Sequence, residues 1–173
     1  MIVRTTLTTL VVGLAACLSS PQAVAGSLAS NAVDSCNGAL PGFEGALRKR
    51  PLGIANEGAA SAFVTCSFTN AYNLSGILDG LVFVTNRRAT SVDITCTFVN
   101  GLVAEAQQVN PDLPLPTYFV KTVALEAGEF APVAVFASDY ELDAFALPYM
   151  NVNCALPSGV EMNLVGYDYS EPA

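Results

Sequence analysis

Three acidic residues alternate along the segment SDYELDAF: Asp139, Glu141 and Asp143. Carboxylate oxygens at alternate positions suit Ca²⁺, which takes about six to eight oxygen ligands. The segment lacks the glycine and the distal glutamate of an EF-hand loop. We treat these residues as a candidate calcium site, and the alternative is a solvated acidic loop.

Tyrosine side chains could form a second kind of site, an aromatic surface for a sugar. Tyr167 and Tyr169 alternate in the segment GYDYSEPA, and Tyr140 lies within the acidic segment. Alternate residues of a strand share one face, so Tyr167 and Tyr169 point the same way. The chain has no tryptophan, which is the usual stacking residue of carbohydrate-binding modules. These tyrosines are candidate ligand-binding residues, and packing against the core is the alternative.

Histidine is absent from the sequence. Its absence excludes Ser-His-Asp and Cys-His nucleophile systems and every histidine general base. A hydrolase with paired carboxylates would need no histidine, but no pair of acids in this sequence has a diagnostic spacing. We therefore predict that the protein is not an enzyme.

The formal net charge is −8, which disfavours phosphate backbones and anionic lipid surfaces as partners. The positive charges concentrate in Arg48-Lys49-Arg50 and in Arg87-Arg88. These two clusters could meet as a small anion patch, or they could be edge-strand charges that discourage pairing with other chains. No nucleic-acid partner is predicted.

Residues 1–25 have the features of a bacterial secretory signal peptide. Arg4 precedes an apolar run over residues 7–18, and Ala23-Val24-Ala25 fits a cleavage site before Gly26. The apolar run is shorter than the roughly 20 residues that a membrane-spanning helix needs. We expect a secreted or periplasmic protein.

A second interpretation of the leader depends on Cys17, which ends the tetrapeptide LAAC. This tetrapeptide looks like the lipobox of bacterial lipoproteins, in which the cysteine carries the lipid. In that case the protein would be anchored in the cell envelope, and this is the one predicted contact with a membrane. Residues 26–35 are small and polar, and we expect them to form a flexible leader or tether.

Four cysteines remain outside the leader: Cys36, Cys66, Cys96 and Cys154. Zinc binding is disfavoured because the chain has no C-x-x-C spacing and no histidine. An even number of cysteines in an exported chain predicts disulfides, and four cysteines allow three connectivities. We favour Cys36 with Cys66 and Cys96 with Cys154, bonds that would stabilise by roughly 3.5 and 4 kcal/mol. Pairing of Cys66 with Cys96 stays open.

Three segments place a cysteine at the centre of an alternating strand: residues 62–68, 92–98 and 150–156. In each segment the cysteine shares one face with apolar residues, while threonine, serine or asparagine occupies the other face. The phrase FVTCSFTN therefore resembles the later ITCTFVN because both are half-buried strands. We attribute the likeness to shared burial rather than to a functional repeat.

The remaining chain has strand patterns at short spacing. The predicted strands cover residues 46–54, 61–69, 78–86, 91–99, 117–125, 130–137, 148–156 and 160–169. About eight strands without an amphipathic helix predict an all-β fold, an antiparallel β-sandwich of jelly-roll or immunoglobulin-like type.

Four details of the chain lead to more local predictions. Pro132 predicts an edge strand or a bulge, and Gly166 a bulge. We expect residues 126–129 to close a hairpin, and the irregular residues 101–116 to cross between the sheets.

Residues 36–171 form one predicted domain, which resembles the uncharacterised small exported β-sandwich proteins of bacteria with paired core cysteines. The resemblance implies an exported, non-catalytic structural or binding protein, whose ligand or envelope partner is unknown. Two alternatives are a carbohydrate-binding module with or without calcium, and a pilus-type assembly subunit. The alternating C-terminal strand with its near-terminal tyrosine is similar to that of pilins.

Overall fold

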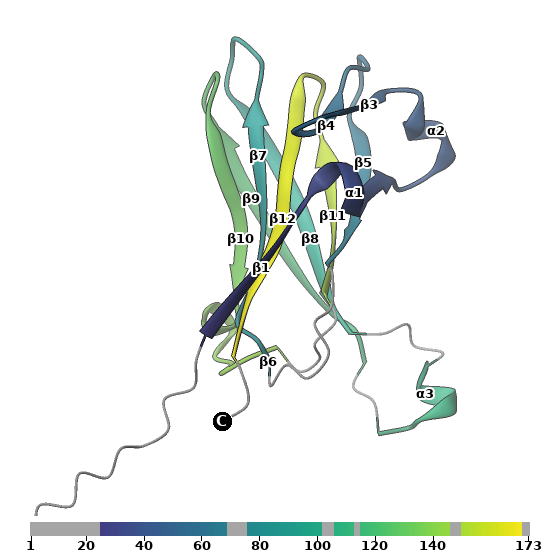
Figure 1. Ribbon diagram of the computed structural model, residues 1–173, viewed down its shortest axis with the longest axis vertical. Helices are drawn as coiled ribbons and strands as arrows, with labels where there is room; N and C mark the ends of the chain where they lie inside the picture. The colour runs from purple at the N-terminus through teal and green to yellow at the C-terminus, as the bar shows by residue number, and fades with distance from the viewer. Residues whose placement is uncertain (1–24, 69–75, 102–105, 113–114, 146–149, 171–173) are drawn as a thin grey trace, which may run out of the picture.

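The computed structural model describes residues 25–68, 76–101, 106–112, 115–145 and 150–170. In this part of the chain two antiparallel sheets account for most of the structure, which confirms the all-β prediction (Figure 1). Sheet A contains seven described strands: β1 (Ala25–Asn31), β3 (Leu47–Arg50), β4 (Gly53–Asn56), β6 (Gly76–Ile77), β7 (Asp79–Asn86), β10 (Phe130–Phe136) and β12 (Val160–Ser170). Sheet B contains five: β2 (Cys36–Gly38), β5 (Ala62–Ser67), β8 (Val92–Asn100), β9 (Thr117–Leu125) and β11 (Met150–Leu156).

The helices are single turns at the periphery of the sheets. They are α1 (Ala32–Ser35), α2 (Pro41–Glu44), α3 (Ala106–Val109) and the 3₁₀ turn η1 (Ala137–Tyr140). Proline at the first position of α2 suits a helix start, because its missing N–H is not needed there.

Four connections at the upper end of the molecule in Figure 1 carry the chain from one sheet to the other. They join β4 to β5, β7 to β8, β9 to β10 and β11 to β12. The strands follow the order β10-β7-β12-β4 in sheet A and β9-β8-β11-β5 in sheet B. The four connections therefore lie side by side, as a row of stacked arches.

The core lies between the two sheets and follows the predicted alternation. In β5 and β11 every second residue is buried, and Ile94, Cys96 and Phe98 are buried in β8. From sheet A, Val82, Val84, Val133 and Val135 meet them as members of the same core cluster. Branched residues suit this position because they pack well on a pleated surface.

Two disulfides connect neighbouring strands of sheet B. Cys36 of β2 bonds to Cys66 of β5, and Cys96 of β8 bonds to Cys154 of β11. In both pairs the cysteines are directly opposite in the strand register, and all four are fully buried. These are the pairs that the sequence favoured, and each bond faces the core.

Two buried asparagines form hydrogen bonds with the backbone of the arches. Asn86 donates its side-chain amide to the carbonyls of Thr90, Leu125 and Glu126 at 2.9, 3.1 and 2.9 Å, and its Oδ1 accepts from the N–H of Arg88. Asn56 does the same in the first arch, with the carbonyls of Ala60 and Leu156 and the N–H of Gly58. Each asparagine thus binds its own arch to the end of the next one.

One strand prediction and the prediction of a flexible leader need correction at the N-terminal side. Residues 46–54 are not one strand, because Pro51 and Leu52 form the turn between β3 and β4. Residues 26–35 are not a flexible leader, because they form most of β1 and all of α1. The fold thus extends N-terminal to the predicted start at residue 36.

Backbone pairing rather than apolar side chains places β1. It pairs with β12 along its whole length, from Ala25 opposite Ser170 to Asn31 opposite Leu164. A Cβ atom on Gly166 would lie 2.6 Å from the carbonyl oxygen of Leu28, so glycine permits this close approach. Gly166 itself is regularly paired, and the β12 bulge lies at Asn163 instead.

Two connections also differ from expectation. Residues 101–116 do not cross between the sheets, because they join β8 to its direct neighbour β9. Residues 126–129 form the expected turn, with the Glu129 N–H bonded to the Glu126 carbonyl, but β9 and β10 belong to different sheets. Pro132 lies in β10, an edge strand of sheet A, as predicted.

Candidate functional site

The tyrosines predicted to bind a ligand do not form one exposed surface. Tyr167 is 2% exposed and packs edge-on against Phe68, with ring centroids 5.9 Å apart. Tyr169 is half-buried, and its ring lies 2.5 Å from where a Cβ of Gly26 would be. Tyr140 is exposed and packs on Phe119. Of the three, Tyr140 alone presents an exposed ring.

The acidic segment lies on the surface, in η1 and the turn that follows it. Asp139, Glu141 and Asp143 are all exposed. Across the described ranges, no three or more acidic, cysteine or histidine side chains come close enough to hold a metal ion. Asp139, Glu141 and Asp143 therefore do not form such a group with one another in the described part of the chain.

Asp143 instead lines a cavity with two acids from distant strands. The cavity has a volume of about 280 Å³ and lies at the lower end of sheet A, where Asp79 begins β7 and Asp168 lies near the end of β12. Phe136 and Leu142 supply apolar wall. Sequence spacing does not reveal this group, because topology alone brings the three acids together.

The carboxylates of Asp79 and Asp168 accept hydrogen bonds from neighbouring strands. Asp79 is 6% exposed and accepts the Asp168 N–H at 2.8 Å, while Asp168 accepts the hydroxyl of Ser27 on β1. Burial raises the pKa of Asp79; the hydrogen bond from the Asp168 N–H opposes this effect, and the Asp168 charge adds to it. The pair thus connects β1, β12 and β7.

We expect Asp79→Asn to stabilise the protein at pH 7. The raised pKa means that folded Asp79 binds its proton more tightly than unfolded Asp79, so its stabilisation is present below the unfolded pKa and is lost as the pH rises through the folded pKa. Asparagine retains the acceptor for the Asp168 N–H and carries no charge.

Thermal melts from pH 4 to pH 8 check this expectation. The variant should melt above the native protein at pH 7, and the difference should shrink toward pH 4. Asp139→Asn, at an exposed position of η1, is the control and should change neither value. A variant that melts lower at pH 7 would show that the Asp79 charge is stabilising.

A second polar cluster lies at the opposite, upper end of sheet A. Glu161 is 1% exposed, and its carboxylate lies 2.8 Å from Arg87 Nε and 3.9 Å from Arg50 Nη1. Arg50 also binds Glu57 at 2.6 Å, a hydrogen bond that raises the pKa of Arg50. The two arginine clusters of the sequence therefore meet here, around a buried carboxylate.

This cluster borders a cavity of about 200 Å³, lined by Arg50, Arg87, Glu57 and Asn56 among others. Both arginines face carboxylates of their own chain, so the cluster first of all compensates the buried charge of Glu161. The arginine side chains remain about half exposed. They leave cationic surface at this end of sheet A.

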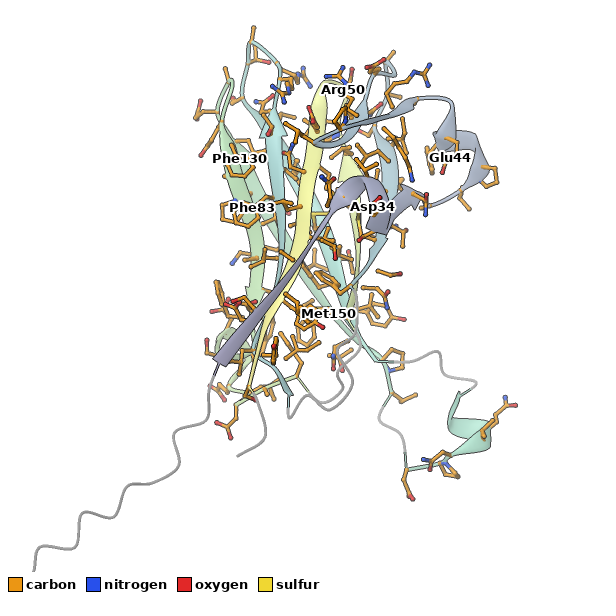
Figure 2. All side chains as sticks on the ribbon, viewed as in Figure 1. Asp34, Glu44, Arg50, Phe83, Phe130 and Met150 are labelled. Atoms are coloured by element: carbon orange, nitrogen blue, oxygen red, sulfur yellow. A yellow bond between two sulfur atoms is a disulfide. The ribbon has the colours of Figure 1, made fainter. Side chains whose placement is uncertain are left out.

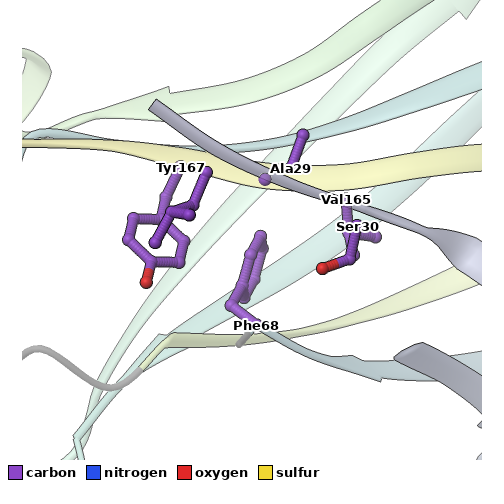
Figure 3. Close-up of a pocket in the computed structure, with 7 residues that line it drawn as sticks. Ala29, Ser30, Phe68, Val165 and Tyr167 are labelled. Carbon is purple, nitrogen blue, oxygen red and sulfur yellow. The ribbon is translucent and has the colours of Figure 1, made fainter. Parts of the chain in front are cut away.

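A third cavity, of about 170 Å³, lies beneath β1 (Figure 3). Phe68 and Tyr167 line it together with Val165, and β1 contributes Ala29 and Ser30. Its wall is mostly apolar. It lies where β1 pairs with the C-terminal half of β12. The small side chains of β1 leave this space unfilled.

The outer face of sheet B is polar and almost uncharged. Cross-strand neighbours on this face include Thr65, Asn153, Thr97 and Val120 in one row and Ser67, Asn151, Val99 and Tyr118 in the next. Hydrogen bonds connect Asn153 to Thr65 and Thr95 to Thr122. Asp93 is the one charged residue among the outward residues of β5, β8, β9 and β11.

The outer face of sheet A is apolar in its middle. Phe83 of β7 and Phe130 of β10 stack with centroids 5.2 Å apart, and Figure 2 shows them together on this side of the molecule. A sequence signal exists for this difference: β7 and β10 contain continuous apolar runs, whereas β5, β8 and β11 alternate.

A comparison with models of known protein families finds no match to this chain, and a comparison with curated proteins finds none either. Among the described residues, no helix is long and apolar enough to cross a membrane. Cys17 and the predicted cleavage site's Ala23-Val24 lie outside the described residues.

Proposed function

We propose that this protein is an exported, non-catalytic β-sandwich that acts as a structural or binding component of a bacterial envelope or exterior. Two buried disulfides are typical of proteins in oxidising compartments outside the cytoplasm. The signal-like residues 1–25 support the same location. Binding is favoured over catalysis because the chain has no histidine and the Asp79–Asp168 pair is engaged within the fold.

The observation that carries a binding function is the outer face of sheet B. Its hydroxyl and amide side chains project in regular rows from paired strands, with Tyr118 64% exposed at one margin. Such groups donate and accept hydrogen bonds without charge, and a tyrosine ring offers a face for stacking. A neutral, hydroxyl-rich polymer, a glycan, is the ligand class that matches this surface.

We expect Tyr118→Ala to weaken glycan binding by about tenfold, which corresponds to loss of about 1.4 kcal/mol. Pull-down of the disulfide-bonded protein on insoluble neutral polysaccharides measures this effect. Tyr140→Ala is the matched control, because Tyr140 is the exposed tyrosine of the acidic segment. If Tyr140→Ala abolishes binding and Tyr118→Ala does not, the acidic segment is the binding site. Absence of any retention would contradict glycan binding.

We also infer that the fold is a β-sandwich. Two antiparallel sheets that share one core support a β-sandwich. The described residues contain twelve strands rather than about eight, because β1, β2 and β6 are short or pair mainly by backbone and residues 46–54 divide in two.

A further inference from the structure

The middle of sheet A's outer face is a continuous apolar band. Leu81 and Phe83 of β7 point outward between their buried neighbours, and they are opposite Ala134 and Pro132 of β10 in the register. On the other side of β7, Leu164 of β12 is opposite Phe83. Phe130 and Phe136 of β10 are 55% and 45% exposed. Contiguous apolar surface of this kind on a folded protein marks an interaction site.

The outer face of sheet B has no comparable band. Threonine, serine and asparagine are interspersed there with Val99, Val120 and Tyr118, whereas both sheets contain the same kind of buried core on their inner faces. Apolar residues on sheet B are therefore mixed with polar ones in each cross-strand row. The band matches what a second sheet would present in face-to-face packing, where apolar side chains from two sheets interdigitate about 10 Å apart.

The two ends of this face carry different charged groups. At the upper end Arg50 and Arg87 stay about half exposed beside Glu161, and Arg50 is labelled above Phe83 and Phe130 in Figure 2. At the lower end the face closes with Asp143 and Asp168 around the cavity next to Phe136. Along its strands the face therefore offers partly exposed guanidinium groups beside their own glutamates, then an apolar middle, then carboxylates.

We propose that this face is the interface of a symmetric dimer, in which two copies of the chain pack sheet A against sheet A. A two-fold axis that runs across the strands, parallel to sheet A and midway between the two copies, places the apolar bands on each other. The same rotation sets the Arg50 and Arg87 end of each copy over the Asp143 and Asp168 end of its partner. A second copy is the occupant whose shape and charges match this face by symmetry.

The dimer is tested on the mature, disulfide-bonded chain by sedimentation equilibrium over a range of protein concentrations. We expect a monomer–dimer equilibrium, and we expect Phe130→Glu to raise the dissociation constant about 100-fold by placing a charge in the apolar band. The matched control is Tyr118→Glu, an exposed aromatic residue on the edge strand of sheet B, which should leave the dissociation constant unchanged.

A second variant, Asp143→Lys, changes an exposed loop residue and should fold normally. We expect it to weaken the dimer, and we expect added salt to weaken the native dimer by screening the contacts between opposite ends. The proposal is overturned if the native protein stays monomeric, if Tyr118→Glu disrupts the dimer as strongly as Phe130→Glu, or if the chain forms open polymers, as a pilus-type subunit would. Circular dichroism of each variant verifies folding.

Discussion

Replacement of Cys96 and Cys154 by alanine should lower the free energy of unfolding by about 4 kcal/mol. The bond closes a loop of 58 residues, and the chain-entropy model gives this magnitude for a loop of that length. Both cysteines are fully buried at the centre of sheet B, where β8 and β11 meet. Alanine avoids placing a polar group in this core.

Guanidinium unfolding under oxidising conditions measures the effect. The double variant of Cys36 and Cys66, which closes a shorter loop of 30 residues, should lose about 3.5 kcal/mol and serves as the comparison. If either double variant is as stable as the native protein, then its disulfide does not stabilise the fold.

The second large effect is expected for Asn86→Ala, with a loss of about 3 kcal/mol. The substitution removes the donor for three backbone carbonyls and the acceptor for one N–H at a fully buried position. Each buried group left without a hydrogen bond costs roughly 1–3 kcal/mol, and water that enters the site offsets part of this cost. Asn56→Ala should act similarly, with a somewhat smaller loss, because Asn56 binds two carbonyls.

Thermal and guanidinium unfolding of both asparagine variants test this role. Asn151→Ala is the control, since Asn151 is half-buried on the outer face of sheet B and its loss should change the free energy of unfolding by less than about 0.5 kcal/mol. Equal stability of Asn86→Ala and Asn151→Ala would mean that the arches do not depend on these side chains.

The two cysteine-centred strands, β5 and β8, each follow a similar arch. Asn56 precedes Cys66 by the same interval as Asn86 precedes Cys96, and each asparagine ends a sheet A strand whose arch leads to the cysteine strand. Gly128 and Gly159 also adopt the same left-handed conformation, with φ of 76° in both partner arches. Shared burial explains the likeness of the two strands, and the arch before each strand is similar as well.

Alternation predicted the core strands well, because half-buried strands must place apolar residues at every second position. It failed for β1, whose small residues carry no such pattern and which pairs with β12 through its backbone. It also failed for residues 46–54, where a turn at Pro51 interrupts an apolar pattern. Backbone pairing and short turns leave little periodic signal.

The sites depend on contacts that no spacing encodes. Asp79 and Asp168 meet because β6 and β7 lie beside the end of β12, and Arg87 meets Glu161 because β7 and β12 are neighbours. The apolar band on the outer face of sheet A likewise arises from β7, β10 and β12, which are far apart in the sequence. A prediction of strand order would have been needed before any of these groups could be recognised.

The proposed function places this chain outside the cytoplasm as a disulfide-bonded binding or structural protein. Peptide mass spectrometry without reduction, on protein recovered from its own host, tests this claim most directly. We predict linked peptides for Cys36–Cys66 and Cys96–Cys154 and a mature N-terminus at Gly26, or at a lipid-modified Cys17 if the protein is anchored. Four free thiols on a chain that retains residues 1–25 would contradict the account.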